Sequence, residues 1–303
     1  MRLMIIQFFA ALIVLTNCVS ALATDRLRIV TSFSILTNLV KEIGGDYVQI
    51  ESLVEAGNDA HHFEPKPSDI KRLLNADLII VNGLGFEPWL DRVIIKSKKA
   101  SDLIIASKNI EPLPFEKADH VHHHSKKVNV DPHAWQDVSN VRIYVKNIAQ
   151  ALIKRDPDHE VAYQNNLNRY DAELIKLDLN IRDSLNLIPV ERRKLVTTHD
   201  AFRYFERAYR LEMIAPLGVS AEAELSAKRM ARIIRQIREQ TIPAIFLETA
   251  IDPRLAEQLA SETGVKIGGT LYADTLSKEN DPAGTYIKMM EANLKTLTKA
   301  LTH

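Results

Sequence analysis

The sequence predicts an α/β protein with two lobes, each built on a mostly parallel four-stranded sheet flanked by helices, joined by one long backbone helix. Two observations lead to this fold. Short apolar runs bounded by polar residues or glycine alternate with helical patterns in both halves of the 303-residue chain, as buried parallel strands and their crossover helices do. Between the halves lies a stretch with helical signals only.

Apolar runs give the expected strands, four in each half: Leu27–Phe33, Val48–Val54, Asp77–Asn82 and Asp102–Ser107, then Lys194–Thr198, Glu212–Leu217, Ala244–Glu248 and Val265–Leu271. An aspartate followed by proline is typical of a helix start, because the carboxylate caps free N–H groups and proline fits the first helical position. This pair predicts three helix starts, at Asp156-Pro157, Asp252-Pro253 and Asp281-Pro282. Gly264 is expected to end the helix that begins after Asp252.

The central stretch predicts a long helix that spans both lobes. Apolar residues recur at helix spacing from Tyr170 to Ile181, and Pro189 ends the pattern. A helix of about 30 residues would be roughly 45 Å long. The expected division is an N-terminal lobe over 24–157, the linking helix over 158–188 and a C-terminal lobe over 189–303.

Residues 1–23 predict an export signal that lies outside the fold. Arg2 precedes the apolar stretch Leu3–Leu15, and Ala21-Leu22-Ala23 is typical of a cleavage site. The apolar stretch is too short to span a bilayer as a helix. Cys18 could mark a lipid anchor, but the asparagine before it fits poorly. We therefore expect a periplasmic protein without an anchor.

Composition limits the classes of function. The chain has 39 basic and 39 acidic side chains, so it lacks the basic excess of an electrostatic nucleic-acid binder. A single cysteine excludes an intramolecular disulfide and a cysteine-based metal site. The hydrophobic share of 46% is ordinary for a globular protein. We expect a monomer.

Four candidate metal ligands lie in loops where α/β proteins usually bind ligands: His61, His133, His199 and Asp274. Three neutral imidazoles and one carboxylate suit a borderline divalent cation such as zinc. Four protein ligands close a tetrahedral shell, whereas catalytic zinc usually keeps one position open for water. The set therefore favours holding a metal over catalysis. Because two ligands come from each half, we expect the ion between the lobes.

Nearby carboxylates could accept the second ring N–H of these histidines and fix the tautomer. Asp59 and Asp131 each lie two residues before a candidate ligand, and Asp200 follows His199. Glu248, which ends a C-lobe strand, is a further candidate for a residue just behind the ligands. Each ligand also has a simpler interpretation, as an exposed loop histidine, a helix cap, a helix-start residue or a turn carboxylate. Glu248 could likewise be a hydrogen-bonded strand-end carboxylate. Local spacing matches no H-E-x-x-H motif and leaves both interpretations open.

The chain resembles the periplasmic zinc/manganese-binding proteins of ABC importers, the ZnuA/TroA-like (cluster A-I) solute-binding proteins. The likeness lies in four segments: GNDAHHFEPKPSDI at 57–70, NVDPHAWQDVSNV at 129–141, TTHDAFRYFERAY at 197–209 and GVKIGGTLYADTLS at 264–277. The resemblance implies that His61, His133, His199 and Asp274 occupy the four ligand positions of the family. It also implies a metal in the cleft, delivery to an ABC permease and its ATPase at the inner membrane, and no catalysis.

The resemblance extends to the choice of metal. In this family a histidine at the third ligand position goes with zinc and a glutamate with manganese, so His199 favours Zn²⁺, with Mn²⁺ as the alternative. Zinc-importing members often carry a histidine-rich loop that collects metal. Here such a loop contains His120, His122, His123 and His124. A solvated loop without function is the other interpretation.

Two other classes of function stay open. A periplasmic zinc-dependent hydrolase would need an open coordination position and a general base such as Glu64 or Glu248. A metal-independent adhesin or interaction module would give His199 no role. The sequence contains no recognisable catalytic pairing, so we expect a binding protein and not an enzyme.

Overall fold

The computed structural model describes residues 26–90, 93, 100–114, 130–218 and 226–302. The predicted export signal at 1–23, with Cys18, and the histidine-rich loop around His120 to His124 fall outside this part of the chain. Within it, no helix is both long and apolar enough to cross a membrane.

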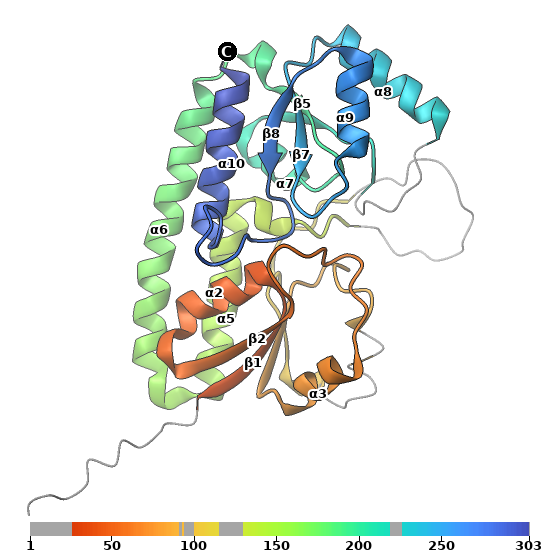
Figure 1. The fold of residues 1–303 in the computed structure, drawn as a ribbon. Coiled ribbons are helices and arrows are strands. Elements are labelled where there is room, and N and C mark those ends of the chain that lie inside the picture. Colours follow the sequence, from red (N-terminus) through yellow and green to blue (C-terminus); the bar gives the residue numbers. More distant parts are fainter. Residues whose placement is uncertain (1–25, 91–92, 94–99, 115–129, 219–225, 303) are drawn as a thin grey trace, which may run out of the picture.

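Each lobe contains a parallel sheet of four strands (Figure 1). The strand order is β2-β1-β3-β4 in the N-terminal lobe and β6-β5-β7-β8 in the C-terminal lobe. The strands are β1 (Leu27–Phe33), β2 (Val48–Val54), β3 (Leu78–Val81), β4 (Leu103–Ile105), β5 (Lys194–Val196), β6 (Glu212–Ile214), β7 (Ile245–Glu248) and β8 (Ile267–Leu271). The predicted fold class is confirmed, because each of these strands lies within one of the expected apolar runs.

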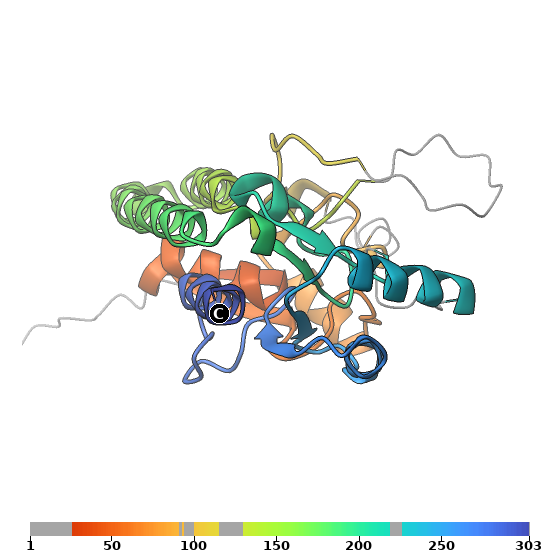
Figure 2. The ribbon, with the colours of Figure 1, turned by 90° about the horizontal axis from the view of Figure 1, so that it is seen from above.

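Helices cover the sheets and connect the lobes. The 27-residue α6 runs alongside both lobes (Figure 1), and Figure 2 places α2, α5, α6 and α10 together on one side of the molecule. The described helices are α2 (Ser34–Gly44), α3 (Pro67–Asn75), α5 (Val138–Arg155), α6 (Glu160–Asn186), α7 (Arg203–Tyr209), α8 (Ala227–Glu239), α9 (Arg254–Thr263) and α10 (Tyr286–Leu301). The lobe boundaries at 157 and 189 stay a prediction.

One hydrophobic core runs through both lobes. It includes Leu39 of α2, Leu174 of α6 and Met289 of α10, all fully buried. Two smaller clusters lie beneath the outer helices, one around Leu73 of α3 and one around Ile233 of α8. Because close-packed interiors resist deformation, the shared core gives the loops between the lobes a stiff frame.

Two of the three aspartate–proline pairs precede helices as predicted. Asp252 lies just before α9, and Gly264 ends that helix in a left-handed conformation with φ of 74°. At Asp156 a short 3₁₀ turn comes first, and the carboxylate contacts the His159 ring and accepts the Tyr163 hydroxyl. A helix-start sequence can thus use its carboxylate for side chains instead of backbone N–H groups.

The predicted helix start at Asp281-Pro282 is wrong. Residues 281–284 form turns and bends, and α10 begins at Tyr286. There the Thr285 hydroxyl accepts the N–H of Lys288 at 3.3 Å, and the Asn38 side chain accepts the N–H of Tyr286 at 2.8 Å. The cap on α10 therefore comes partly from α2 in the other lobe, which no local pattern reveals.

Candidate metal centre

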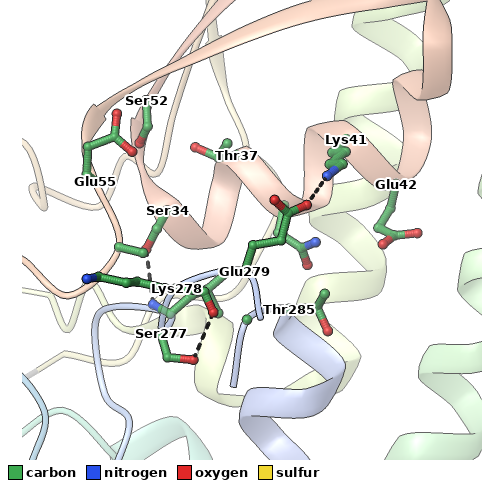
Figure 3. Close-up of a pocket in the computed structure, with 14 residues that line it drawn as sticks. Ser34, Thr37, Lys41, Glu42, Ser52, Glu55, Ser277, Lys278, Glu279 and Thr285 are labelled. Carbon is green, nitrogen blue, oxygen red and sulfur yellow. Dashed lines mark hydrogen bonds and ion pairs between the residues drawn. The ribbon is translucent and has the colours of Figure 1, made fainter. Parts of the chain in front are cut away.

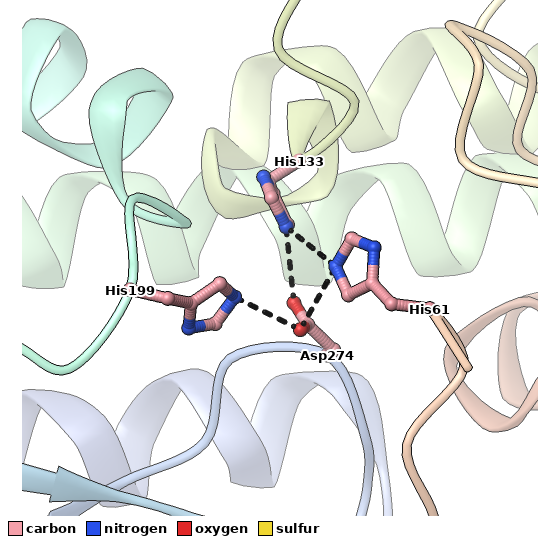
Figure 4. Close-up of side chains that lie close together, drawn as sticks. All are labelled: His61, His133, His199 and Asp274. Carbon is pink, nitrogen blue, oxygen red and sulfur yellow. Dashed lines mark hydrogen bonds and ion pairs between the residues drawn. The ribbon is translucent and has the colours of Figure 1, made fainter. Parts of the chain in front are cut away.

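The loops after parallel strands bring the candidate ligands together. His61 follows β2, His199 follows β5 and Asp274 follows β8, while His133 precedes α5. Since parallel strands end at the same edge of a sheet, these loops meet where the two lobes face each other. Figure 4 shows the three imidazoles grouped around the Asp274 carboxylate.

The donor atoms of these four residues all lie within 4.8 Å of one another. His61 Nε2 lies 3.1 Å from His133 Nε2 and 3.3 Å from Asp274 Oδ2. His199 Nε2 lies 3.1 Å from the same Asp274 oxygen, and His133 Nε2 lies 3.5 Å from Oδ1. A tetrahedron with bonds of about 2.0 Å has edges of about 3.3 Å, so these four distances are close to those between neighbouring ligands of one small cation.

Burial also fits a bound cation. His133 and His199 are fully buried, and Asp274 is only 7% exposed. Asp274 Oδ1 is buried and makes no hydrogen bond within the described residues. A buried carboxylate oxygen without a donor is costly, and a metal ion is the kind of partner that would remove this cost.

The backbone around His61 is fixed by its own loop. The Asp59 carboxylate accepts the N–H of His61 at 2.8 Å, and the imidazole lies edge-on to the Phe86 ring at 4.8 Å. The other Asp59 oxygen lies 3.5 Å from His62 Nε2. Asp59 therefore holds the backbone of one histidine and faces the ring of its neighbour, whereas the sequence suggested contact with the His61 ring.

His133 and His199 each have a buried carboxylate against the ring nitrogen that points away from the centre. Asp131 Oδ1 lies 2.8 Å from His133 Nδ1 and also accepts the His133 N–H at 2.9 Å. Glu248 Oε2 lies 2.6 Å from His199 Nδ1, and Oε1 accepts the His199 N–H at 3.0 Å. These contacts favour a proton on Nδ1 and leave each Nε2 lone pair for a metal.

His199 lies in a loop, so the alternative interpretation of this histidine as a helix-start residue is wrong. Residues 199–202 are bends or irregular backbone, and α7 begins at Arg203. Glu248 also accepts the N–H of Thr198. A carboxylate from β7 therefore takes the N–H groups that a helix start would leave free.

Charges within the centre are coupled. Burial acts to raise the pKa of Asp274, but His133 and His199 outweigh it and hold this pKa well below its usual value. Burial acts to lower the pKa of His199, but Glu248 and Asp274 outweigh it and raise this pKa well above its usual value. The surroundings therefore stabilise positive charge at the centre, as a cation site requires.

Two side chains next to His133 hold the loop that carries Asp274. The Ala273 carbonyl accepts the Trp135 indole N–H at 2.9 Å and the Gln136 amide at 2.7 Å. All three residues are buried. The loop that carries His133 and the loop that carries Asp274 are therefore joined directly by hydrogen bonds, although they come from opposite lobes.

The same loop is also tied to the N-terminal lobe on its other side. The Thr275 hydroxyl accepts the N–H of Gly57 at 2.8 Å, and the Ser34 hydroxyl accepts the N–H of Leu276 at 3.1 Å. Gly57 has φ of 83°, which a residue with a side chain rarely adopts. Sequence reasoning missed Ser34 and Thr275, because nothing local links residues more than 200 positions apart.

We expect Glu248→Gln to weaken metal binding by about 10- to 100-fold, the range for partners of metal-bound histidines. In this variant the glutamine amide oxygen can still accept the N–H groups of Thr198 and His199, as Glu248 Oε1 does. Its NH₂ group then faces His199 Nδ1, which favours the tautomer with the proton on Nε2. That proton occupies the atom that should bind the metal. Calorimetric competition titration measures the change, with Glu257→Gln on α9 as the control. Equal affinity in the wild type and in the Glu248 variant would contradict this role.

A cavity of about 510 Å³ lies between α2, the end of β2 and the segment 276–285 (Figure 3). Its lining contains none of the four candidate ligands. Lys41 and Glu279 form an ion pair of 2.7 Å across it, joining the two lobes. Both side chains are largely exposed, so the pair contributes little to stability.

Comparisons with known proteins agree with this fold. A family profile described as "Zinc-uptake complex component A periplasmic" (ZnuA) matches residues 29–300. The manganese-binding lipoprotein MntA of Halalkalibacterium halodurans is 34% identical over 278 residues, covering 92% of this chain and 89% of the relative. The iron-binding protein YfeA of Yersinia pestis is 33% identical over 274 residues, covering 90% and 86%.

Solved structures show the same architecture. The periplasmic zinc-binding protein TroA of Treponema pallidum superimposes with a TM-score of 0.83 at 31% identity, covering 92% of this chain and 100% of its own. A Mn-bound mutant of a periplasmic metal-binding protein from Candidatus Liberibacter asiaticus gives 0.82 at 30% identity, covering 91% and 100%. The chain therefore belongs to the ZnuA family, whose members are metal-binding, substrate-binding proteins of ABC importers and not enzymes.

Proposed function

We propose that this protein captures one divalent metal ion at His61, His133, His199 and Asp274 and delivers it to an ABC permease with its ATPase at the inner membrane. The observation that carries the proposal is the convergence of four donor groups with spacings of 3.1–3.5 Å between neighbours. A closed set of four protein ligands suits storage and release of the ion. If the protein were a metal-independent interaction module, the clustering of these buried donor groups would have no explanation.

Zinc is the proposed ion and manganese the alternative. Three imidazoles with one carboxylate form the softer set that zinc prefers, and four of the donor–donor distances are close to the edge of a tetrahedral site. Asp274 offers both oxygens to the centre, at 3.1 Å from His199 and 3.5 Å from His133. Binding through both oxygens would add a fifth donor, an arrangement better suited to manganese.

Export before function is part of the proposal, with cleavage either after Ala23, which removes Cys18, or directly before Cys18, which keeps it. The expectation that Cys18 carries no lipid anchor is not supported, because the relative MntA is named a lipoprotein. An anchor at Cys18 would keep the protein at the membrane where the permease lies. The monomeric state and the metal-collecting role of the histidines at 120–124 stay predictions.

Titration of the chelator-stripped protein tests the function. We expect one Zn²⁺ per chain by calorimetry, loss of binding in His133→Ala, and unchanged binding in the matched control His159→Ala. Because most nitrogen and oxygen sites bind Zn²⁺ more tightly than Mn²⁺, affinity alone does not identify the cargo. Elemental analysis of protein purified without added metal should therefore find zinc. Absence of one-to-one binding by either ion would refute the proposal.

A further inference from the structure

The buried centre needs a route by which its ion enters and leaves. A cavity of about 560 Å³ borders two of the ligand loops. Its lining includes Asp59 and His62 from the N-terminal lobe and Thr198 from the C-terminal lobe. His62 is the chain neighbour of His61, and Thr198 is the chain neighbour of His199. The lining contains none of the four ligands themselves, but it includes a residue next to a ligand from each lobe, so the cavity lies beside two of the loops that form the centre.

His62 and Asp59 form a pair of donors in this cavity. His62 Nε2 lies 3.5 Å from Asp59 Oδ2, and the two side chains are 32% and 26% exposed. This spacing is close to the edge of about 3.3 Å between two ligands of one small cation. Two partly exposed donors hold a cation only weakly, because water keeps the remaining coordination positions.

Thr198 supplies an independent observation. The residue is 1% exposed, and its hydroxyl oxygen makes no hydrogen bond within the described residues. Buried hydroxyl groups nearly always have a partner. An ion or its water shell passing from the cavity toward His199 would provide one.

We propose that His62 and Asp59, with the Thr198 hydroxyl, form a transient capture site through which a partly hydrated divalent cation reaches and leaves the metal centre. This inference rests on the proposed function. His62 and Asp59 replace some of the water ligands of the ion before His61 takes it over. A site on the path lowers the barrier in both directions, so it changes the rates of loading and release and leaves the equilibrium affinity unchanged.

Stopped-flow loading of the chelator-stripped protein with Zn²⁺, followed by release into excess chelator, tests the capture site. Tryptophan fluorescence reports the reaction, since the Trp135 ring lies 5.2 Å from the His133 ring. In His62→Ala we expect both rate constants to fall by the same factor, about fivefold or more, with an unchanged dissociation constant. His62→Glu keeps a donor and should retain rates near those of the wild type.

The remaining outcomes separate this inference from the proposed function. His159→Ala, which removes a partly exposed histidine on the turn before α6, is the matched control and should leave both rates unchanged. Unchanged or faster exchange in His62→Ala would overturn the capture site, since faster exchange means that the side chain only obstructs the path. A weaker equilibrium affinity would instead make His62 a ligand of the bound state and also overturn it. If the wild type binds no metal, the proposed function fails first.

Discussion

Replacing Asp274 by asparagine is expected to weaken Zn²⁺ binding roughly 10²- to 10³-fold, the effect of removing one partner from a buried charge interaction. Asp274 is the one carboxylate in the proposed ligand set, and its oxygens lie within 3.5 Å of all three imidazoles. Asparagine has nearly the same shape but no charge, so the bound ion would lose its counter-charge in a site that water scarcely reaches.

Asp252→Asn is the matched control, because Asp252 is an exposed carboxylate that pairs with Arg254. Competition calorimetry gives both affinities, and circular dichroism of the metal-free variants shows whether the fold is retained. An Asp274→Asn variant that is folded and binds zinc as tightly as the wild type would exclude Asp274 as a ligand.

Metal affinity is expected to fall steeply as the pH decreases from about 8 to about 5, because protons and the metal compete for the same imidazole nitrogens. Glu248 and Asp274 raise the pKa of His199 in the metal-free protein. His199 therefore stays protonated at pH values above about 6.5, the usual pKa of histidine. Metal binding must release this proton. Affinity is greatest above the raised pKa and is lost as the pH falls through it, by up to about tenfold per pH unit for each proton released.

Calorimetry in buffers of different ionisation enthalpy counts the protons released at each pH. We expect the number to rise as the pH is lowered toward the range in which the other imidazoles also protonate. The control is the thermal stability of the metal-free protein across the same range, which identifies any loss of fold. Constant affinity from pH 8 to pH 5 would contradict histidine ligation.

The strands were predictable because a strand that is buried on both faces is a nearly continuous run of apolar residues. Residues of β3, for example, are all buried, and their apolar side chains form an unbroken run. The ends of helices were less predictable. Thr285 and not Asp281 precedes α10, because Asn38 from another helix shares the capping of that end. Capping by a distant side chain leaves no local pattern.

The sequence alone determined the parallel α/β class, the long central helix and the choice of three histidines and one aspartate as candidate donors. The fold class and the helix follow from residue type and local periodicity. The candidate donors follow from their residue type, from their positions in loops and from the resemblance to the family. Only the tertiary structure decided that the four donors lie within 4.8 Å of one another. It also decided that Glu248 lies against His199, 49 positions away, and that Thr275 bonds Gly57 across 218 positions. The physical reason is that a donor's partners are set by which loops the packed sheets bring together, and that packing depends on the whole chain.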